Sequence, residues 1–143
     1  MTTPEIVQAT QEMIRADKPF VLATVDAGGV PQMRWMGAAM LDEPLTVFMA
    51  AGANSRKMDQ MRAHPQSQLM FQDEDFTRVA TLSGTCEVVG DIETKRRVWQ
   101  GIPAAAHYHS APEDPTFGVI KFVCRRVELL NIKESHTPAV VEL

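Results

Sequence analysis

The sequence of 143 residues has few of the features that mark disulfide-rich, membrane-spanning or nucleic-acid-binding proteins. Its two cysteines, Cys86 and Cys124, lie far apart in strand-like runs. We interpret them as reduced core residues of a cytoplasmic protein, in preference to a disulfide or a metal site. No apolar run approaches the length of about 18 residues that a transmembrane helix needs, so no membrane partner is expected. No basic run offsets the net charge of −4, which argues against nucleic acid as a partner.

The chain also lacks internal repeats and low-complexity segments. Glu5 comes early and no apolar run precedes it, so we expect no signal peptide. The hydrophobic content of 45% and the charged content of 22% are ordinary for a soluble globular protein. We therefore expect one domain over residues 1–143, long enough to bury a core.

Short apolar and β-branched runs recur along the chain and are separated by turn residues. Runs of this kind, joined by hairpins, predict an antiparallel sheet, and six of them often close into a barrel. The expected fold class is mainly β with flanking α-helices, as a six-stranded antiparallel barrel. The six strands are expected at residues 20–25, 30–40, 45–50, 66–71, 79–89 and 117–130.

Three helices are expected around this sheet. Thr2 and Glu5 have the spacing of a capping box that begins the first helix, which we expect to end at Asp17–Pro19. Shorter helices are expected at residues 58–63 and 92–100. Residues 101–116 form a loop long enough to serve a function. The apolar phase shifts near Arg125 and Arg126, which predicts a β-bulge, and the last dozen residues are expected to form a tail or arm.

The segment from Ala50 to Lys57 lies between a predicted strand and a predicted helix. The first turn of a helix has unpaired N–H groups and a partial positive charge. Ser55 suits the N-cap position, and Arg56 and Lys57 add two cations beside it. Together these features predict an anion site, with phosphate as the expected anion. The alternative is an ordinary capped surface helix with solvated basic residues.

Arg34 is unusual because it is a cation in the middle of a predicted strand, between Met33 and Trp35. It either faces solvent or holds an anion. Pairing of the second predicted strand with the third would bring Arg34 close to Arg56 and Lys57, and three cations would neutralise a phosphate dianion well. No glycine-rich dinucleotide loop or P-loop is present, so the pattern favours a phosphate monoester.

No catalytic residue can be assigned from the sequence. The serines have no histidine partner at a diagnostic spacing, which argues against a nucleophilic triad. His107 and His109, on either side of Tyr108, could supply two metal ligands, but no third ligand has a telling spacing. We therefore expect no metal and interpret these three residues as part of a solvated loop or of the rim of a site.

Several motifs, in this order and spacing, resemble the pyridoxamine 5′-phosphate oxidase-like, FMN-binding split-barrel superfamily, and most closely its general-stress-protein-like branch. The resemblance covers about residues 20–130. No one motif carries it alone. The motifs are Leu22–Asp26 with Gly29–Pro31, Arg34–Met36, Ser55–Lys57 with Met61–Pro65, Leu82–Val89 and Pro112–Pro115.

This resemblance implies a six-stranded split β-barrel that forms a homodimer, with two FMN sites at the subunit interface. By position, Arg34 and the Ser55-Arg56-Lys57 group would bind the phosphate and ribityl chain of FMN. The backbone of Trp35, Met36 and Gly37 would run along the isoalloxazine ring. Ala50 and Ala51 fall where relatives have residues that contact the ring and the phosphate, often through a hydroxyl that these alanines lack.

The function expected from the resemblance is that of a dimeric flavoprotein oxidoreductase that acts on an unidentified small molecule. The family's substrate-phosphate arginines and histidine near the C-terminus have no clear match, so we do not expect pyridoxamine phosphate oxidase activity. One alternative is a non-catalytic or stress-related module that binds FMN, a deazaflavin or pyridoxal phosphate. Another is a cofactor-free dimer in which the basic cluster is vestigial.

Overall fold

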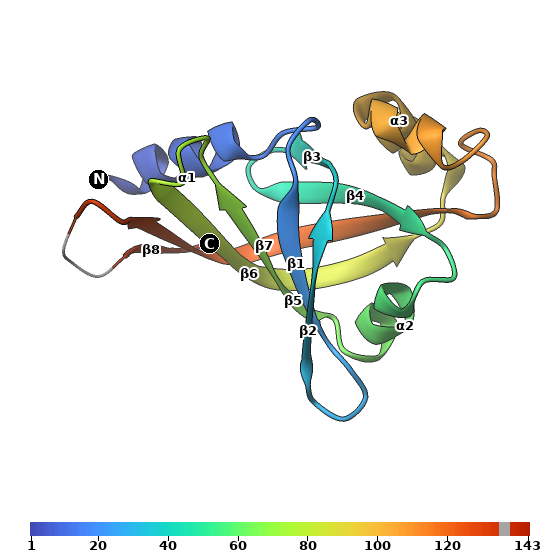
Figure 1. Ribbon diagram of the computed structural model, residues 1–143, viewed down its shortest axis with the longest axis horizontal. Helices are drawn as coiled ribbons and strands as arrows, with labels where there is room; N and C mark the ends of the chain where they lie inside the picture. Colours follow the sequence, from blue (N-terminus) through green and yellow to red (C-terminus); the bar gives the residue numbers. More distant parts are fainter. Residues whose placement is uncertain (135–137) are drawn as a thin grey trace.

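The computed structural model describes residues 1–134 and 138–143, which fold around one antiparallel sheet (Figure 1). Each strand lies close to a run expected from the sequence, except the last. The strands are β1 (Phe20–Val25), β2 (Pro31–Met36), β3 (Ala39–Asp42), β4 (Thr46–Gly52), β5 (Gln66–Gln72), β6 (Arg78–Val89), β7 (Phe117–Asn131) and β8 (Ala139–Glu142).

The sheet has the order β2-β1-β5-β6-β7-β4-β3, and β8 adds to β7 beside this path. No ladder within the described residues joins β2 to β3, so the barrel is split between these two strands. The expected six strands become eight for two reasons. The predicted strand over residues 30–40 breaks at Gly37 and Ala38, where the chain passes from one edge of the sheet to the other. Part of the expected tail forms β8, and residues 135–137 of that tail lie outside the described residues.

The helices are α1 (Thr3–Met13), α2 (Arg56–Ala63) and α3 (Ile92–Gly101), followed by the 3-10 turn η1 (Pro103–His107). The capping box of α1 is confirmed, because Thr2 N donates to Glu5 and Glu5 N donates to Thr2 Oγ1. The predicted end of α1 at Asp17–Pro19 was wrong. Ile14 is already extended, with φ −91° and ψ 105°, and its side chain is buried in the core. In Figure 1, α1 and α3 lie over opposite ends of the molecule, and α2 lies beside the lower part of the β1–β2 hairpin.

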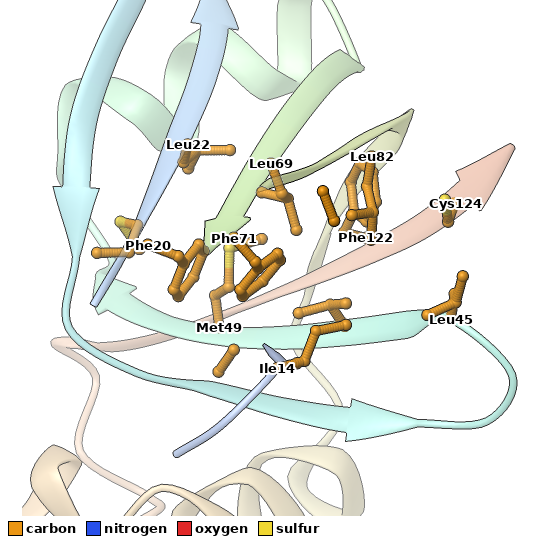
Figure 2. Packing of buried hydrophobic residues seen from close by; sticks show 14 of the residues in the cluster. Ile14, Phe20, Leu22, Leu45, Met49, Leu69, Phe71, Leu82, Phe122 and Cys124 are labelled. Atoms are coloured by element: carbon orange, nitrogen blue, oxygen red, sulfur yellow. The ribbon is translucent and has the colours of Figure 1, made fainter. Parts of the chain in front are cut away.

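The main core lies inside the curved sheet and is closed by α1 and α2. Phe20 of β1 and Phe71 of β5 stack there with ring centroids 4.7 Å apart (Figure 2). Met58 and Met61 point from α2 into the same core, as the helical spacing predicts. A second apolar cluster fills the space under α3 and includes Phe48, Val98 and Phe117. These two clusters bury the two faces of β4, because Val47 and Met49 belong to the first cluster and Phe48 to the second.

A bulge separates the two halves of the long β6–β7 ladder, as the sequence predicts. Gly84 pairs with Cys124 and Ser83 pairs with Arg126, so Arg125 is the extra residue. A side chain at Gly84 would meet the backbone oxygen of Val123 and the ring of Phe122, and glycine is therefore required at this position. Among the described residues, no helix is long and apolar enough to cross a membrane.

Candidate functional site

The N-terminus of α2 carries an unusual serine. Ser55 takes the N-cap position with extended φ and ψ, as expected, but its side chain makes no capping hydrogen bond. Its Oγ atom is buried and has no hydrogen-bond partner among the described residues. A buried hydroxyl without a partner costs free energy unless a ligand supplies the hydrogen bond. The predicted capping role of the Ser55 side chain was therefore wrong, and its hydroxyl is free to bind a ligand.

Arg34 projects from β2 toward α2 and is held there by neutral acceptors. Its Nη1 donates to Thr24 Oγ1 over 2.7 Å and to the Leu22 carbonyl over 3.3 Å, and its Nη2 donates to Gln60 Oε1 over 3.0 Å. Thr24 Oγ1 in turn donates to the same Gln60 oxygen over 2.6 Å. None of these partners carries a negative charge. The network orients the guanidinium and leaves its charge uncompensated.

Arg34 lies close enough to Arg56 and Lys57 for their charges to interact. Burial lowers the pKa of Arg34, and the charge of Arg56 lowers it further. Burial also lowers the pKa of Lys57, as does the charge of Arg34. No ion pair within residues 1–134 and 138–143 includes any of the three cations. A cation cluster that is partly buried and unpaired, beside a helix N-terminus, is an electrostatic site for an anion.

The structure brings these three cations together by a route that differs from the expected one. β2 pairs with β1 alone, not with the strand that precedes α2. The contact arises because α2 packs against β1, which lies between β2 and β5 in the sheet. Arg34 reaches across β1 to Gln60 at the middle of α2. The expected pairing holds only for the end of the predicted strand, because Ala39 and Met40 pair with β4 whereas Arg34 lies in β2. The contact of a helix with a distant strand cannot be deduced from the alternation within strands.

A cavity of about 380 Å³ lies next to this cluster. It is lined by Gly37 and Ala38 after β2, by the end of β4, and by the loop that follows α3. Gly37 lies three positions after Arg34, and Ser55 lies three positions after Gly52, so each segment spans at most about 11 Å. The chain therefore keeps the cation cluster and the cavity lining within reach of one small ligand. The volume of the cavity is within the range of about 300–1,000 Å³ typical of small-molecule sites.

The remaining predicted site residues fall in three environments. Ala50 and Ala51 line the cavity together with Gly37. Met36 is buried in the core, whereas the side chain of Trp35 is 64% exposed on the outer face of β2. Contact of the Trp35–Gly37 backbone with a ring stays a prediction.

The loop over residues 101–116 separates the three residues of the expected rim. Tyr108 and His109 line the cavity, and His107 does not. Within the described residues, no group of three or more His, Cys, Asp or Glu side chains is placed to hold a metal.

Sequence reasoning missed Thr24 and Gln60 as members of the site. Thr24 is 1% exposed in an otherwise apolar strand, and a hydroxyl at such a position needs a partner. That signal was present in the sequence. Gln60 carries no comparable signal, because a glutamine in a short helix is ordinarily solvated.

Both cysteines lie outside this site and are buried and unpaired. Burial raises the pKa of each thiol to about 11, so both remain protonated at neutral pH and are poor nucleophiles. Their interpretation as core residues is confirmed.

Solved structures share this fold over almost the whole chain. General Stress Protein 26 from Bacillus anthracis str. Sterne is 18% identical, with a TM-score of 0.78 and 100% of both chains covered. A Clostridium acetobutylicum protein related to general stress protein 26 is 15% identical, with a TM-score of 0.81, over 99% of this chain and 97% of that one. A pyridoxamine 5′-phosphate oxidase-related, FMN binding protein from Nostoc punctiforme PCC 73102 is 15% identical, with a TM-score of 0.73, over 96% and 85%. At these identities the likeness is one of fold.

No curated protein sequence matches the chain. The sequence profile of the family described as "Pyridoxamine 5'-phosphate oxidase" matches residues 6–131. This range contains β1 to β7, the cation cluster and the cavity. The resemblance found in the sequence is thereby confirmed, and the chain belongs to the pyridoxamine 5′-phosphate oxidase family.

Proposed function

We propose that this protein binds FMN and works as a flavin-dependent oxidoreductase on a small molecule. The observation that carries the proposal is the buried Ser55 hydroxyl at the N-terminus of α2, near three cations. Within the part of the chain that the structure describes, the hydroxyl has no hydrogen-bond partner and the cations have no ion pair. A phosphate monoester supplies what this arrangement lacks, since it brings two negative charges and several hydrogen-bond acceptors. Membership of a family with an FMN-binding structural neighbour supports the same cofactor.

The residues fit the two ends of FMN. Arg34, Ser55, Arg56 and Lys57 would hold the phosphate, through the helix N-terminus and the charges of their side chains. The cavity beside them would hold the ring, against walls formed mainly by glycine and alanine. The methyl groups of Ala50 and Ala51 offer no hydrogen bonds, so contacts with the ring would come from backbone groups and from the loop opposite.

When bound, the flavin supplies the capacity for hydride or electron transfer. The protein's own residues bind the phosphate, orient the ring and restrict the access of water. No acid or base is required of the protein for the transfer itself, so this function does not depend on a catalytic triad. Family membership does not carry the activity of pyridoxamine phosphate oxidase to this chain, because function is decided by the site.

The proposal includes a homodimer with the cofactor sites at the subunit interface. β2 is an edge strand, and Met33 and Trp35 on its outer face are 75% and 64% exposed. Trp35 pairs with Val21, which pairs with Met70, so these side chains form one row across the outer face of the sheet. An apolar edge of this kind favours cover by another chain. Replacing Trp35 with Glu should shift the protein from dimer to monomer in analytical ultracentrifugation.

The direct test is the visible spectrum of the purified protein, followed by titration with FMN and with riboflavin. We expect bound flavin, and riboflavin binding weaker by about 10-fold or more because it lacks the phosphate. A colourless protein that takes up no added FMN would refute the proposal. A spectrum typical of a deazaflavin or of pyridoxal phosphate would show that the cofactor is not FMN, and the proposed phosphate site would still stand.

Turnover is tested separately from binding. Anaerobic addition of NADH or NADPH should bleach the visible bands of the bound flavin if the protein accepts electrons from a nicotinamide donor. Retention of the oxidised spectrum with both donors, and with artificial reductants that enter the site, would favour storage or sensing over catalysis.

A further inference from the structure

His109 belongs to a short chain of hydrogen bonds behind the cavity. Its Nδ1 lies 2.9 Å from Thr116 Oγ1, and Thr116 Oγ1 lies 2.8 Å from Asp114 Oδ1. Asp114 also accepts hydrogen bonds from the backbone of Thr116 and from both the backbone and the hydroxyl of Ser110. These bonds hold the pKa of Asp114 well below its usual range. Asp114 is therefore a carboxylate, which can only accept.

This geometry determines the tautomer of His109. The Thr116 hydroxyl has one hydrogen, and that hydrogen goes to the Asp114 carboxylate. The oxygen of Thr116 must then accept the bond from His109, so Nδ1 of the imidazole carries a hydrogen. In the neutral ring, Nε2 is left with a lone pair and no hydrogen. His109 therefore offers a hydrogen-bond acceptor, not a donor, at its free end.

The imidazole is also held in place by packing. Its ring lies 5.3 Å from that of Phe117, at an interplanar angle of 53°, and Phe117 is buried under α3. Because Nδ1 is occupied, Nε2 is the polar atom that the ring can present to the cavity that His109 lines. On α3, Lys95 Nζ lies 5.7 Å from the Phe117 centroid, and Tyr108 lines the same cavity as His109.

We propose that His109 is a fixed-tautomer acceptor that receives a hydrogen bond from the ring N–H of a flavin bound in the cavity. This inference rests on the proposed function, since it assigns a contact to the ring of that cofactor. A hydrogen-bond acceptor at this wall favours a group with an N–H donor. The two ends of the site then bind different groups. The cations bind the phosphate, and the acceptor binds an N–H group of the ring.

The tautomer can be measured without any cofactor. We expect ¹⁵N NMR of the wild-type protein, at a pH where His109 is neutral, to show the Nδ1–H form. In Thr116→Val, which keeps the shape and removes the hydroxyl, the two tautomers should mix. A wild-type protein in the Nε2–H form would overturn the proposal, because its free end would then be a donor.

The contact with the ring is tested by FMN titration of matched variants. His109→Asn keeps a donor near Nδ1 but cannot reach the Nε2 position, and it should weaken FMN binding about 3- to 10-fold. His109→Gln places an amide oxygen near Nε2 and should remain within about twofold of the wild type. His107→Asn is the control on the same loop, because His107 does not line the cavity.

Three outcomes separate the two proposals. Loss of affinity in His109→Asn, with recovery in His109→Gln, supports the contact. Equal affinity of wild type and His109→Asn overturns this inference and leaves the proposed function standing. A wild-type protein that binds no FMN overturns the proposed function and this inference with it, whereas the NMR result would still decide the tautomer. Melting curves of each variant exclude misfolding as the cause.

Discussion

Arg34 and Gln60 are joined by a hydrogen bond of 3.0 Å from the guanidinium Nη2 to the amide Oε1, across 26 residues of sequence. The amide oxygen also accepts a bond from Thr24, so it fixes a cation and a hydroxyl at once. An aspartate or glutamate at position 60 would pair with Arg34 and neutralise it. A neutral amide orients the guanidinium and leaves its charge for a ligand.

Replacing Arg34 should reduce FMN affinity strongly. We expect Arg34→Ala to raise the Kd by about 10- to 100-fold, since hydrogen bonds to charged groups are worth about 1.5–3 kcal/mol. Arg34→Lys should lie between this variant and the wild type, because lysine keeps the charge but loses the planar fork. Arg62→Ala is the control, since Arg62 lies on α2 and pairs with Asp59 at the surface. Fluorescence titration measures all three, and equal losses in Arg34→Ala and Arg62→Ala would contradict the assignment.

Replacing Ser55 should separate stability from binding. Without ligand, Ser55→Ala should leave the free energy of unfolding unchanged or raise it by up to about 1 kcal/mol, because it removes a buried hydroxyl without a partner. FMN affinity should fall in the same variant. The matched control is Thr2→Ala, which removes a real N-cap bond and should cost about 1 kcal/mol. Urea denaturation of the apo proteins distinguishes the two, and a loss in Ser55→Ala as large as that in Thr2→Ala would restore a capping role.

The lowered pKa of Lys57 predicts a pH dependence with a definite sign. Burial and the charge of Arg34 disfavour protonated Lys57 in the folded state, so the unfolded chain binds this proton more tightly. The resulting destabilisation is complete at neutral pH and is relieved as pH rises through the lowered pKa toward the ordinary value of about 10.4. Lys57→Met should therefore raise the Tm of the apo protein at pH 7, and its advantage over the wild type should shrink as the pH increases.

The same variant should lose sensitivity to phosphate. Inorganic phosphate should raise the Tm of the wild-type apo protein more than chloride at equal ionic strength, because it binds the folded cation cluster. Lys57→Met should show a smaller shift. If its Tm falls at pH 7 while its response to phosphate stays that of the wild type, Lys57 does not belong to an anion site.

The glycine at the β6–β7 bulge should be sensitive to the smallest substitution. Gly84→Ala places a methyl group against the Val123 carbonyl and the Phe122 ring, and it should cost about 1–3 kcal/mol. Gly90→Ala is the control, since a Cβ there meets nothing within 4 Å and should change stability by less than about 0.5 kcal/mol. The urea midpoints of both variants check this, and similar midpoints would show that the bulge yields to the methyl group.

The elements that the sequence predicts well are those whose signals are local. The cap at Thr2, the strand at residues 20–25 and the bulge at Arg125 each follow from neighbouring residues. The pairing of the strands does not, because it depends on which surfaces meet after folding. Arg34, Arg56 and Lys57 were therefore expected together but by the wrong contact. The short strand β8 also escaped prediction, since its four residues pair only because β7 is already in place.

Two short segments, from Arg34 to Gly37 and from Gly52 to Ser55, each cover three positions along the chain. On the proposed function, both connect the phosphate end of the site to its ring end, and β2 and β4, from which they come, contribute Met36 and Met49 to the core. Their short length limits how far apart the two ends of the proposed site can lie. An added residue in either segment should therefore weaken FMN binding while leaving the barrel intact. A larger flavin, which continues beyond its first phosphate, would have to place the rest of the molecule on the far side of the cations at the start of α2.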